Sequence, residues 1–394
     1  MPTIGLRANV KMLESQANWA REWLFDAALP FWWQVGADHE GGFHEKIALD
    51  GRPVPALRRI RVQTRQAYSF IEGGRLGWPG PWKDAAAHAV DFMRTRYCRA
   101  DGLYRALVAP GGTPLDETAD LYDQAFVLFA LAHAHSAGIG GADVLSDGRS
   151  LLAALKAQQS HPVGGFEEAS SRVLPLRSNP HMHLLESQLA WMAAGVREPF
   201  EAMAREIVEL ALNHLLDHET GAIGEYYDGD WRFAEGAAGR LREPGHQFEW
   251  AYLFLQAGRQ LGLDRRAEAT RLYAFGTRFG IEPVGRAVIF SVDAGGEPIE
   301  TRARLWAQTE RLRAALAFAA VERDGEERKV FEAHAKEAFD VLKSYLDVPV
   351  VGLWRDQKLP NGIFIEEASP ASSFYHIVTA FATLMEAAGL VKAI

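Results

Sequence analysis

The chain has 394 residues, of which 48% are apolar and 24% charged, a composition typical of a folded globular protein. Its formal net charge of −9, with basic residues scattered among acids, argues against a nucleic-acid partner, because phosphate binding needs a basic face. No window approaches the roughly 18 apolar residues that span a bilayer, and the N-terminus lacks a signal-peptide pattern. We therefore expect a cytoplasmic protein with no membrane partner.

The single cysteine, Cys98, excludes an intramolecular disulfide. It ends the apolar helical pattern AVDFMRTRYC, which predicts a buried and inert thiol. No nearby residue in the sequence would lower its pKa, so we do not expect a catalytic thiol.

Helical periodicity dominates the chain. Apolar residues recur at i, i+3, i+4 and i+7 in about twelve segments, which come in pairs. The expected helices span residues 10–35, 58–77, 82–97, 120–137, 146–159, 181–195, 198–216, 245–262, 264–279, 303–321, 325–346 and 372–390. No long linker interrupts them, so we expect residues 1–394 to form a single catalytic domain.

Between the helix pairs a short element recurs, in which a glycine precedes an aromatic or aliphatic residue and a brief extended stretch. Its copies begin at Gly41 (GGFHEKI), Gly102 (GLYRALV), Gly164 (GGFEEAS), Gly221 (GAIGEYY), Gly285 (GRAVIFSV) and Gly352 (GLWRDQ). A spacing of about 60 residues predicts six repeats of helix, turn, helix and short hairpin. Six repeats can close into an all-α (α/α)6 barrel, a toroid with short β-hairpins in the loops on one face.

An open helical solenoid is the alternative to this closed barrel. We favour closure because the loops are long and carry aromatic and ionisable groups suited to the floor of a pocket. Enzymes commonly use the mouth of such a barrel.

The segment PGHQFEWAYLFL, from Pro244, begins an apolar helix with His246 in its first turn. Glu249 follows one turn later, where its carboxylate can contact the imidazole or a ligand hydroxyl. A helix N-terminus disfavours imidazolium, so we expect a neutral His246 that accepts a proton. A capping histidine followed by a first-turn glutamate explains this segment equally well.

A second segment, SNPHMHLLESQLAWM, offers Asn179 as the cap of a helix that carries His183 and Glu186. The repetition of His-x-x-Glu at two helix starts favours a functional role over capping alone. His181 and His183 could also be metal ligands, but residues two apart point to different helix faces and no third clustered ligand accompanies them. We therefore expect no metal.

Two further segments carry candidate site residues. In PASSFYHIVTAFATLM, His376 has apolar and aromatic neighbours, which is typical of a core histidine, but it completes a set with the other two. In RRIRVQTRQAYSF, Arg65 lies on a helix that otherwise appears buried. An enediolate oxygen and a structural ion pair are equally good partners for its guanidinium.

Aromatic residues near loop or helix ends can stack on the C–H faces of a sugar ring. They are Trp32, Trp33, Tyr122, Trp250, Trp306 and Trp354. Trp306 is the best candidate, because its neighbours Gln308 and Glu310 can bind hydroxyls.

At these residues the sequence resembles the N-acylglucosamine 2-epimerase superfamily over nearly its whole length. The resemblance rests on six motifs in order, VQTR, YDQAF, NPHMHLLE, PGHQFEW, WAQTE and SFYHIV. It implies an (α/α)6 barrel without metal, cofactor or covalent intermediate. It also implies a proton transfer at C2 of an opened sugar through a cis-enediolate.

The resemblance further implies roles for individual residues. His376 would be the main acid/base at C2, and His246 the second acid/base, tuned by Glu249. Arg65 would stabilise the enediolate oxygen. The residues that would position the sugar are His183, Asn179, Glu186, Trp306 and Tyr122.

The sequences of the motifs PGHQFEW and SFYHIV are closer to those of the mannose-isomerase branch than to those of the disaccharide epimerases. We therefore favour isomerisation of D-mannose to D-fructose, with 2-epimerisation as the alternative. No glycine-rich phosphate nest is evident, which favours an unphosphorylated monosaccharide over a phosphorylated one. A disaccharide substrate stays open. A homodimer is compatible with the resemblance, although no interface is evident in the sequence.

Two other functions compete with this interpretation. A glycoside hydrolase would need two carboxylates, and DETADLYDQ offers Asp116, Glu117, Asp120 and Asp123, but the three histidines would then be unexplained. A non-catalytic helical-repeat protein that binds sugar would need a wide groove and a large apolar patch.

Overall fold

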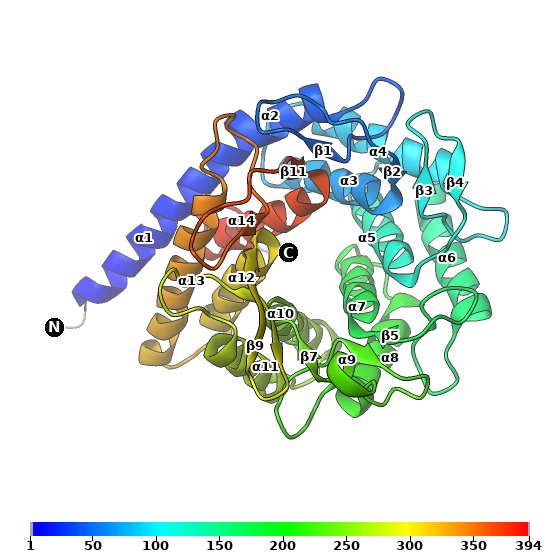
Figure 1. The fold of residues 1–394 in the computed structure, drawn as a ribbon. Coiled ribbons are helices and arrows are strands. Elements are labelled where there is room, and N and C mark those ends of the chain that lie inside the picture. Colours follow the sequence, from blue (N-terminus) through cyan, green and yellow to red (C-terminus); the bar gives the residue numbers. More distant parts are fainter. Residues whose placement is uncertain (1–2, 393–394) are drawn as a thin grey trace.

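The computed structural model describes the backbone of residues 3–392 and the side chains from Leu13 onward, and its helices form a ring (Figure 1). Each inner helix packs against the next, and the last packs against the first. The inner helices are α3 (Ile60–Arg75), α5 (Leu121–Ala137), α7 (Ser178–Ala193), α10 (Pro244–Leu261), α12 (Leu305–Val321) and α14 (Phe374–Ala387). The predicted (α/α)6 barrel is therefore confirmed, and the open solenoid is excluded.

An outer layer of helices surrounds the inner ring, and each outer helix packs against one inner partner. In the order of their inner partners, they are α4 (Trp82–Arg96), α6 (Asp143–Gln159), α8 (Phe200–Leu210), α11 (Arg266–Phe279), α13 (Gly325–Tyr345) and α1 (Thr3–Glu22). The outer helices bury one face, whereas the inner ones are buried on nearly all sides, as the apolar run FVLFALA in α5 illustrates.

The expected helix over 10–35 begins earlier and is less regular than its periodicity suggested. After α1 the chain continues through the π-helical turn η1 (Trp23–Ala28), the short α2 (Leu29–Phe31) and a second π-helical turn, η2 (Trp32–Gly36). Another π-helical turn, η3 (Ala211–Leu215), extends α8, so that the two together fill the expected helix over 198–216. Among the described residues, no helix combines the length and hydropathy needed to cross a membrane.

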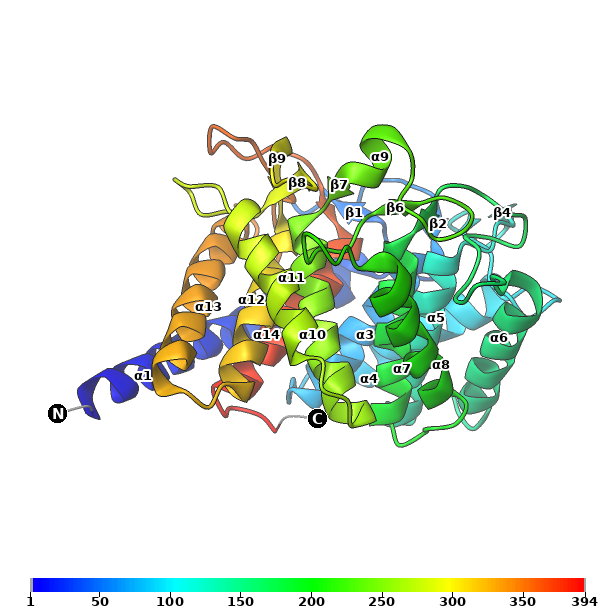
Figure 2. The same cartoon turned by 90° about the horizontal axis from the view of Figure 1, so that it is seen from below.

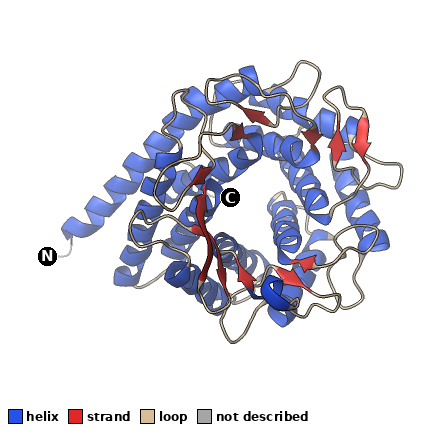
Figure 3. Cartoon of the chain, in the orientation of Figure 1, coloured by secondary structure: helices blue, strands red, loops and turns tan. Residues whose placement is uncertain are grey.

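Short antiparallel strands lie together at one end of the helices (Figures 2 and 3). They form sheets β1-β11, β2-β3-β4, β5-β6 and β10-β9-β8-β7. The strands are β1 (Lys46–Ile47), β2 (Arg58–Arg59), β3 (Leu107–Val108), β4 (Pro114–Asp116), β5 (Leu176–Arg177), β6 (Tyr226–Tyr227), β7 (Leu241–Arg242), β8 (Ile289–Asp293), β9 (Pro298–Arg304), β10 (Gln357–Lys358) and β11 (Ser369–Pro370).

This hairpin face holds the N-terminal ends of the inner helices. Strands β2, β5 and β9 run directly into α3, α7 and α12, while β11 leads through the 3-10 turn η4 (Ala371–Ser373) into α14. A short helix, α9 (Gly236–Arg240), precedes β7 and α10. The unpaired N–H groups and positive dipole ends of the inner helices thus converge on one face, where they favour negative charge.

A buried polar side chain from each repeat holds its hairpin in place; in five repeats this side chain belongs to an inner helix, and in the sixth it is Ser369 of β11. Each such side chain hydrogen-bonds the backbone of the aromatic or aliphatic residue of the glycine element. The pairs are Gln63 with Phe43, Gln124 with Tyr104, His181 with Phe166, Gln247 with Ile223, Gln308 with Val288, and Ser369 with Trp354. The prediction that Gln308 binds sugar hydroxyls is therefore wrong, because its amide is used inside the fold.

In two of these elements glycine leaves room for the fastening side chain. Gly42 has φ of 71°, and a Cβ atom there would lie 2.6 Å from Oε1 of Gln63. A Cβ atom at Gly165 would lie 2.8 Å from Nε2 of His181. Any larger residue at these positions would meet both the left-handed backbone and the fastening side chain.

We expect Gln124→Met to lower the free energy of unfolding by about 2 kcal/mol or more, because it strands a buried N–H and a buried C=O of Tyr104. The chemical-denaturation midpoint measures the change. Gln158→Met, at an exposed position, is the control. Equal midpoints for the two variants would show that the buried amide does not stabilise the hairpin.

Cys98 is exposed, so the expectation of a buried thiol is wrong. Helix α4 ends at Arg96, and Cys98 lies in the turn that pairs with Tyr104, outside the apolar face of the helix. Partial burial and the nearby Asp147 carboxylate nevertheless raise the pKa of the thiol, which leaves it a weak nucleophile.

Candidate active site

A cavity of about 270 Å³ opens at the hairpin face, at the N-terminal ends of the inner helices. Every predicted site residue except Glu186 lines it. The lining consists of Arg65, Tyr122, Asn179, His183, Glu243, His246, Glu249, Phe290, Arg304, Trp306, Ser372, Ser373 and His376. Glu186 instead faces a second cavity, nearer the C-terminal ends of the inner helices.

His246 lies in the first turn of α10, with two carboxylates against its ring. Its Nδ1 is 2.8 Å from Oε2 of Glu225 and 3.6 Å from Oε2 of Glu243. Burial alone would lower the pKa of His246, but the two carboxylates outweigh burial and raise it to about 10. The expectation of a neutral His246 is therefore wrong: two close charges dominate over the helix N-terminus, and the ring is an imidazolium.

His376, in α14, has the opposite protonation. Its Nδ1 lies 2.8 Å from Oε1 of Glu310, and burial lowers its pKa below the ordinary histidine value despite that carboxylate. The lowered pKa favours the neutral ring, and an ionised Glu310 favours the tautomer that carries its proton on Nδ1 and a lone pair on Nε2. Glu310 is fully buried, and its partner is His376. The expectation that it binds hydroxyls, which came from its position near Trp306, is therefore wrong.

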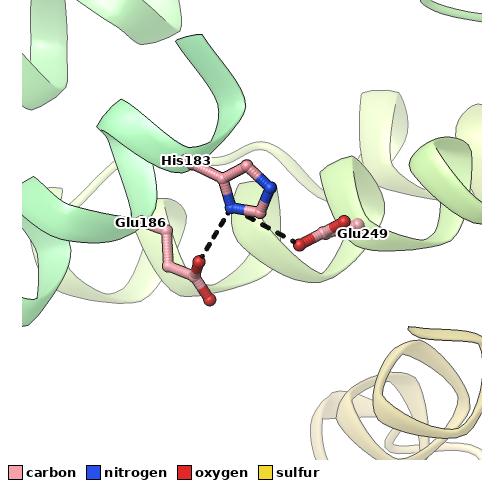
Figure 4. Close-up of side chains that lie close together, drawn as sticks. All are labelled: His183, Glu186 and Glu249. Atoms are coloured by element: carbon pink, nitrogen blue, oxygen red, sulfur yellow. Dashed lines mark hydrogen bonds and ion pairs between the residues drawn. The ribbon is translucent and has the colours of Figure 1, made fainter. Parts of the chain in front are cut away.

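His183 and Glu186 form the contact that their spacing on α7 predicts (Figure 4). Nδ1 of His183 lies 3.2 Å from Oε2 of Glu186 and 3.8 Å from Oε1 of Glu249. Burial lowers the pKa of His183 to about 4. Glu249 was expected beside His246, but its Oε1 lies against Nδ1 of His183 instead.

Glu249 and Asn179 each leave a buried oxygen without a hydrogen-bond partner among the described residues. Burial, together with the nearby Glu310 and Glu186 carboxylates, raises the pKa of Glu249 well above its ordinary value. Asn179 lies inside α7 rather than at its cap, which is Arg177, so the capping prediction is wrong. Both side chains therefore present polar groups to the cavity.

Arg65 differs from the other arginines near the start of α3. Arg58, Arg59 and Arg61 form ion pairs with Asp38, Glu45 and Asp123, respectively. Arg65 donates instead to the carbonyl oxygen of Ser372 at 3.1 Å and to the Tyr122 hydroxyl. Within the described chain no carboxylate pairs with it, so its positive charge remains available to a ligand.

Trp306 lies in the first turn of α12, beside two of the histidines. Its ring centroid lies 4.9 Å from that of His246 and 5.9 Å from that of His376.

Three clusters of histidine and glutamate atoms are compact enough to hold a divalent ion. They are His183–Glu186–Glu249, Glu225–Glu243–His246 and Glu249–Glu310–His376, with ligand atoms within 4.8 Å of one another. In each cluster a histidine Nδ1 already faces a carboxylate, and Arg313 forms ion pairs with Glu186 and Glu310. Each cluster thus already holds an internal hydrogen bond or ion pair, while Oε1 of Glu249 has no hydrogen-bond partner among the described residues.

The acids that a glycoside hydrolase would have used lie outside the cavity. Asp116 and Glu117 are exposed. Asp120 caps α5, and Asp123 is buried in its ion pair with Arg61. This segment does not supply a catalytic carboxylate pair.

Glu225 and Arg313 were not predicted from the sequence, and Glu310 was predicted to bind hydroxyls rather than a histidine. Glu225 stands in the repeated element GAIGEYY, two residues after Ile223, just as Glu45 and Glu168 stand two residues after Phe43 and Phe166. Glu45 and Glu168 both bind arginines that precede an inner helix, Arg59 and Arg177. The position that Glu225 shares with Glu45 and Glu168 in the repeat therefore indicates a carboxylate at the mouth of the barrel.

Comparisons with known proteins identify the family of the chain. The sequence profile of the N-acylglucosamine 2-epimerase (GlcNAc 2-epimerase) family matches residues 41–380. A mannose-6-phosphate isomerase of Rhizobium meliloti is 42% identical over 93% of this chain and 95% of its own. A D-mannose isomerase of Marinomonas mediterranea is 27% identical over 61% and 64% of the two chains.

Among solved structures, a cellobiose 2-epimerase from Spirochaeta thermophila has the same fold. Its TM-score is 0.85 at 22% identity, with 99% of both chains covered. The family profile spans most of the chain, and the relatives are named as isomerases and epimerases. The chain therefore belongs to the N-acylglucosamine 2-epimerase family and is an enzyme that acts on sugars.

Proposed function

We propose that this enzyme interconverts an unphosphorylated aldose and its ketose, with D-mannose and D-fructose as the pair. The observation that carries the proposal is the opposite protonation of the two histidines beside Trp306. Burial keeps His376 neutral, whereas carboxylates hold His246 as an imidazolium with a pKa of about 10. Two groups whose pKa values are pushed apart in one cavity are the arrangement of a general base and a general acid.

In the proposed reaction, Nε2 of His376 takes the C2 proton of the opened aldose. The C–H electron pair forms the C1–C2 double bond of a cis-enediolate, and the C1 carbonyl oxygen becomes anionic. The same imidazole then returns the proton to C1, while His246 donates a proton to O1 and recovers one from O2. C2 is oxidised, C1 is reduced, and no outside reductant is needed.

Arg65 is the proposed partner of the enediolate oxygen. Its guanidinium lies at the cavity without an acidic partner, and Tyr122 with the carbonyl of Ser372 fixes its orientation. The N-terminal ends of the inner helices add to the positive potential at the same face. His183, Asn179, Glu249 and Trp306 would position the sugar, and Glu186 would act through His183.

An unphosphorylated sugar fits the charges of the cavity wall. Besides Arg65, the arginine that lines the cavity is Arg304, which donates to Asp356 at 2.8 and 3.1 Å. A phosphate dianion would have to compete with that carboxylate and with nearby Glu243. We therefore expect kcat/KM for D-mannose to exceed that for D-mannose 6-phosphate by about tenfold or more. The reverse preference would overturn this part of the proposal and would agree with the name of the Rhizobium relative.

Epimerisation at C2 remains the second candidate because of the charge on His246. An epimerase returns a proton to C2 from the opposite face, and an imidazolium across the cavity from the base can supply it. Formation of glucose from mannose, without fructose, would favour this outcome.

We expect Glu225→Gln to move the alkaline limit of activity to lower pH by about one unit or more, because the acid form of His246 depends on this carboxylate. Activity should fall as pH rises through the pKa of His246, and the variant lowers that pKa. A pH profile of kcat measures the shift. Glu45→Gln is the matched control, since Glu45 holds the same repeat position but binds Arg59. Equal shifts in both variants would contradict the assignment of His246.

A further inference from the structure

A continuous chain of buried charges joins two histidines of the cavity. Nδ1 of His376 faces one oxygen of Glu310 at 2.8 Å, and Arg313 donates to the other at 2.7 Å. On its far side Arg313 donates to one oxygen of Glu186 at 3.4 Å, and the other oxygen lies 3.2 Å from Nδ1 of His183. Arg313 thus occupies the centre of the sequence His376, Glu310, Arg313, Glu186 and His183.

Arg313 is enclosed in this position. Its side chain is 2% exposed, and its guanidinium carbon lies 4.2 Å from the centroid of the Tyr252 ring. It does not line the sugar cavity, but it does line the second cavity on the other side of this layer. Arg313 therefore cannot act by touching the sugar.

The layer holds three carboxyl groups, from Glu186, Glu249 and Glu310, and they are close enough to repel one another if all ionise. Arg313 forms ion pairs with two of them, Glu186 and Glu310, and thereby offsets that repulsion. Other titratable groups face the layer from every neighbouring inner helix. They are Arg65 and Tyr68 on α3, His133 on α5, His183 on α7, Glu249 and Tyr252 on α10, and Tyr375 and His376 on α14.

We propose that Arg313 is a positioning residue that keeps Glu310 and Glu186 as ionised acceptors. His376 and His183 then carry their ring protons on Nδ1 and present Nε2 to the sugar. The effect of Arg313 on catalysis rests on the proposed function. The tautomers of His376 and His183 do not depend on which sugar reacts.

Removal of the Arg313 guanidinium should raise the pKa values of Glu310 and Glu186, so that these groups become protonated and do not merely move apart. Without Arg313, Glu310 ionises only at higher pH, and its protonated form can donate its O–H to Nδ1 of His376, which places the ring proton on Nε2. The base form of His376 with its lone pair on Nε2 then exists only above that pH. The acid limit of activity should consequently move upward.

The test compares Arg313→Met and Arg313→Lys with Arg311→Met. Arg311 is an equally buried arginine on the same helix, but it pairs with Glu337 on α13, outside the site. We expect Arg313→Met to lower kcat by about tenfold or more and to raise the acid limit by about one pH unit. Arg313→Lys should restore most of the pH limit. Arg311→Met should leave that limit unchanged even if it lowers stability.

Nitrogen-15 NMR of histidine-labelled protein tests the tautomer directly, with His376→Asn used to assign the resonance. In the unsubstituted enzyme at neutral pH we expect His376 with its proton on Nδ1, a result that can be obtained even if Arg313→Met does not fold. A proton on Nε2 would overturn the proposal, as would an acid limit in Arg313→Met that matches that of Arg311→Met. If the enzyme converts no sugar but the tautomer is as expected, the proposed function fails and the positioning of His376 stands.

Discussion

Replacing His376 with asparagine should lower kcat for aldose–ketose interconversion by about 10³-fold, the upper range for loss of a positioned general base. The neutral imidazole lies 2.8 Å from Glu310 and beside Trp306, where it is placed to take the C2 proton. The asparagine amide can still donate to Glu310, so the fold should persist. Steady-state kinetics and the rate of deuterium exchange at C2 measure the loss, and both should fall together.

The control for this variant is His334→Asn, which changes a histidine between outer helices, where it contacts Tyr273. Its kcat should equal that of the unsubstituted enzyme. Substantial turnover by His376→Asn, with C2 exchange intact, would refute the assignment of His376 as the base.

Arg65→Ala should lower kcat by about 10²-fold to 10³-fold and change KM far less. The guanidinium has no carboxylate partner within the described structure, so its charge is available to the oxyanion that develops in the transition state. An interaction made mainly with that oxyanion affects turnover rather than ground-state binding. Steady-state kinetics with D-mannose separates the two parameters.

Arg59→Ala provides the matched comparison, because Arg59 precedes the same helix but is half-exposed and paired with Glu45. We expect little change in either parameter for this variant. A rise in KM with unchanged kcat for Arg65→Ala would mean that Arg65 only binds the sugar.

The fold could be predicted because its signals are local. The apolar spacing of the helices and the glycine elements repeat along the chain, and most hairpins are fastened by a glutamine amide 20 to 24 residues away, as Gln63 fastens Phe43. The π-helical turns after α1 could not be predicted, since apolar periodicity is similar for an α-helix and for one interrupted by single wide turns. The exposure of Cys98 depended on where α4 ends, one or two residues being enough to move a side chain out of the apolar face.

The residues of the site could be predicted from the sequence, but the protonation states of its histidines could not. The motifs located all but one of the expected residues on one cavity, yet the protonation of each histidine is decided by a partner elsewhere in the chain. Glu225 lies 21 positions from His246, and Glu310 lies 66 from His376. Local helix physics alone therefore predicted the wrong charge for His246.

The most direct test of the account is proton NMR of D-mannose in D2O with the purified, EDTA-treated enzyme. Exchange of the proton at C2 with appearance of fructose as the main product is the predicted result, since one neutral base serves C2 and C1. Glucose as the main product would contradict the isomerase assignment and place the enzyme among the 2-epimerases. Absence of both products and of any exchange at C2 would contradict the choice of mannose or the role of the histidines.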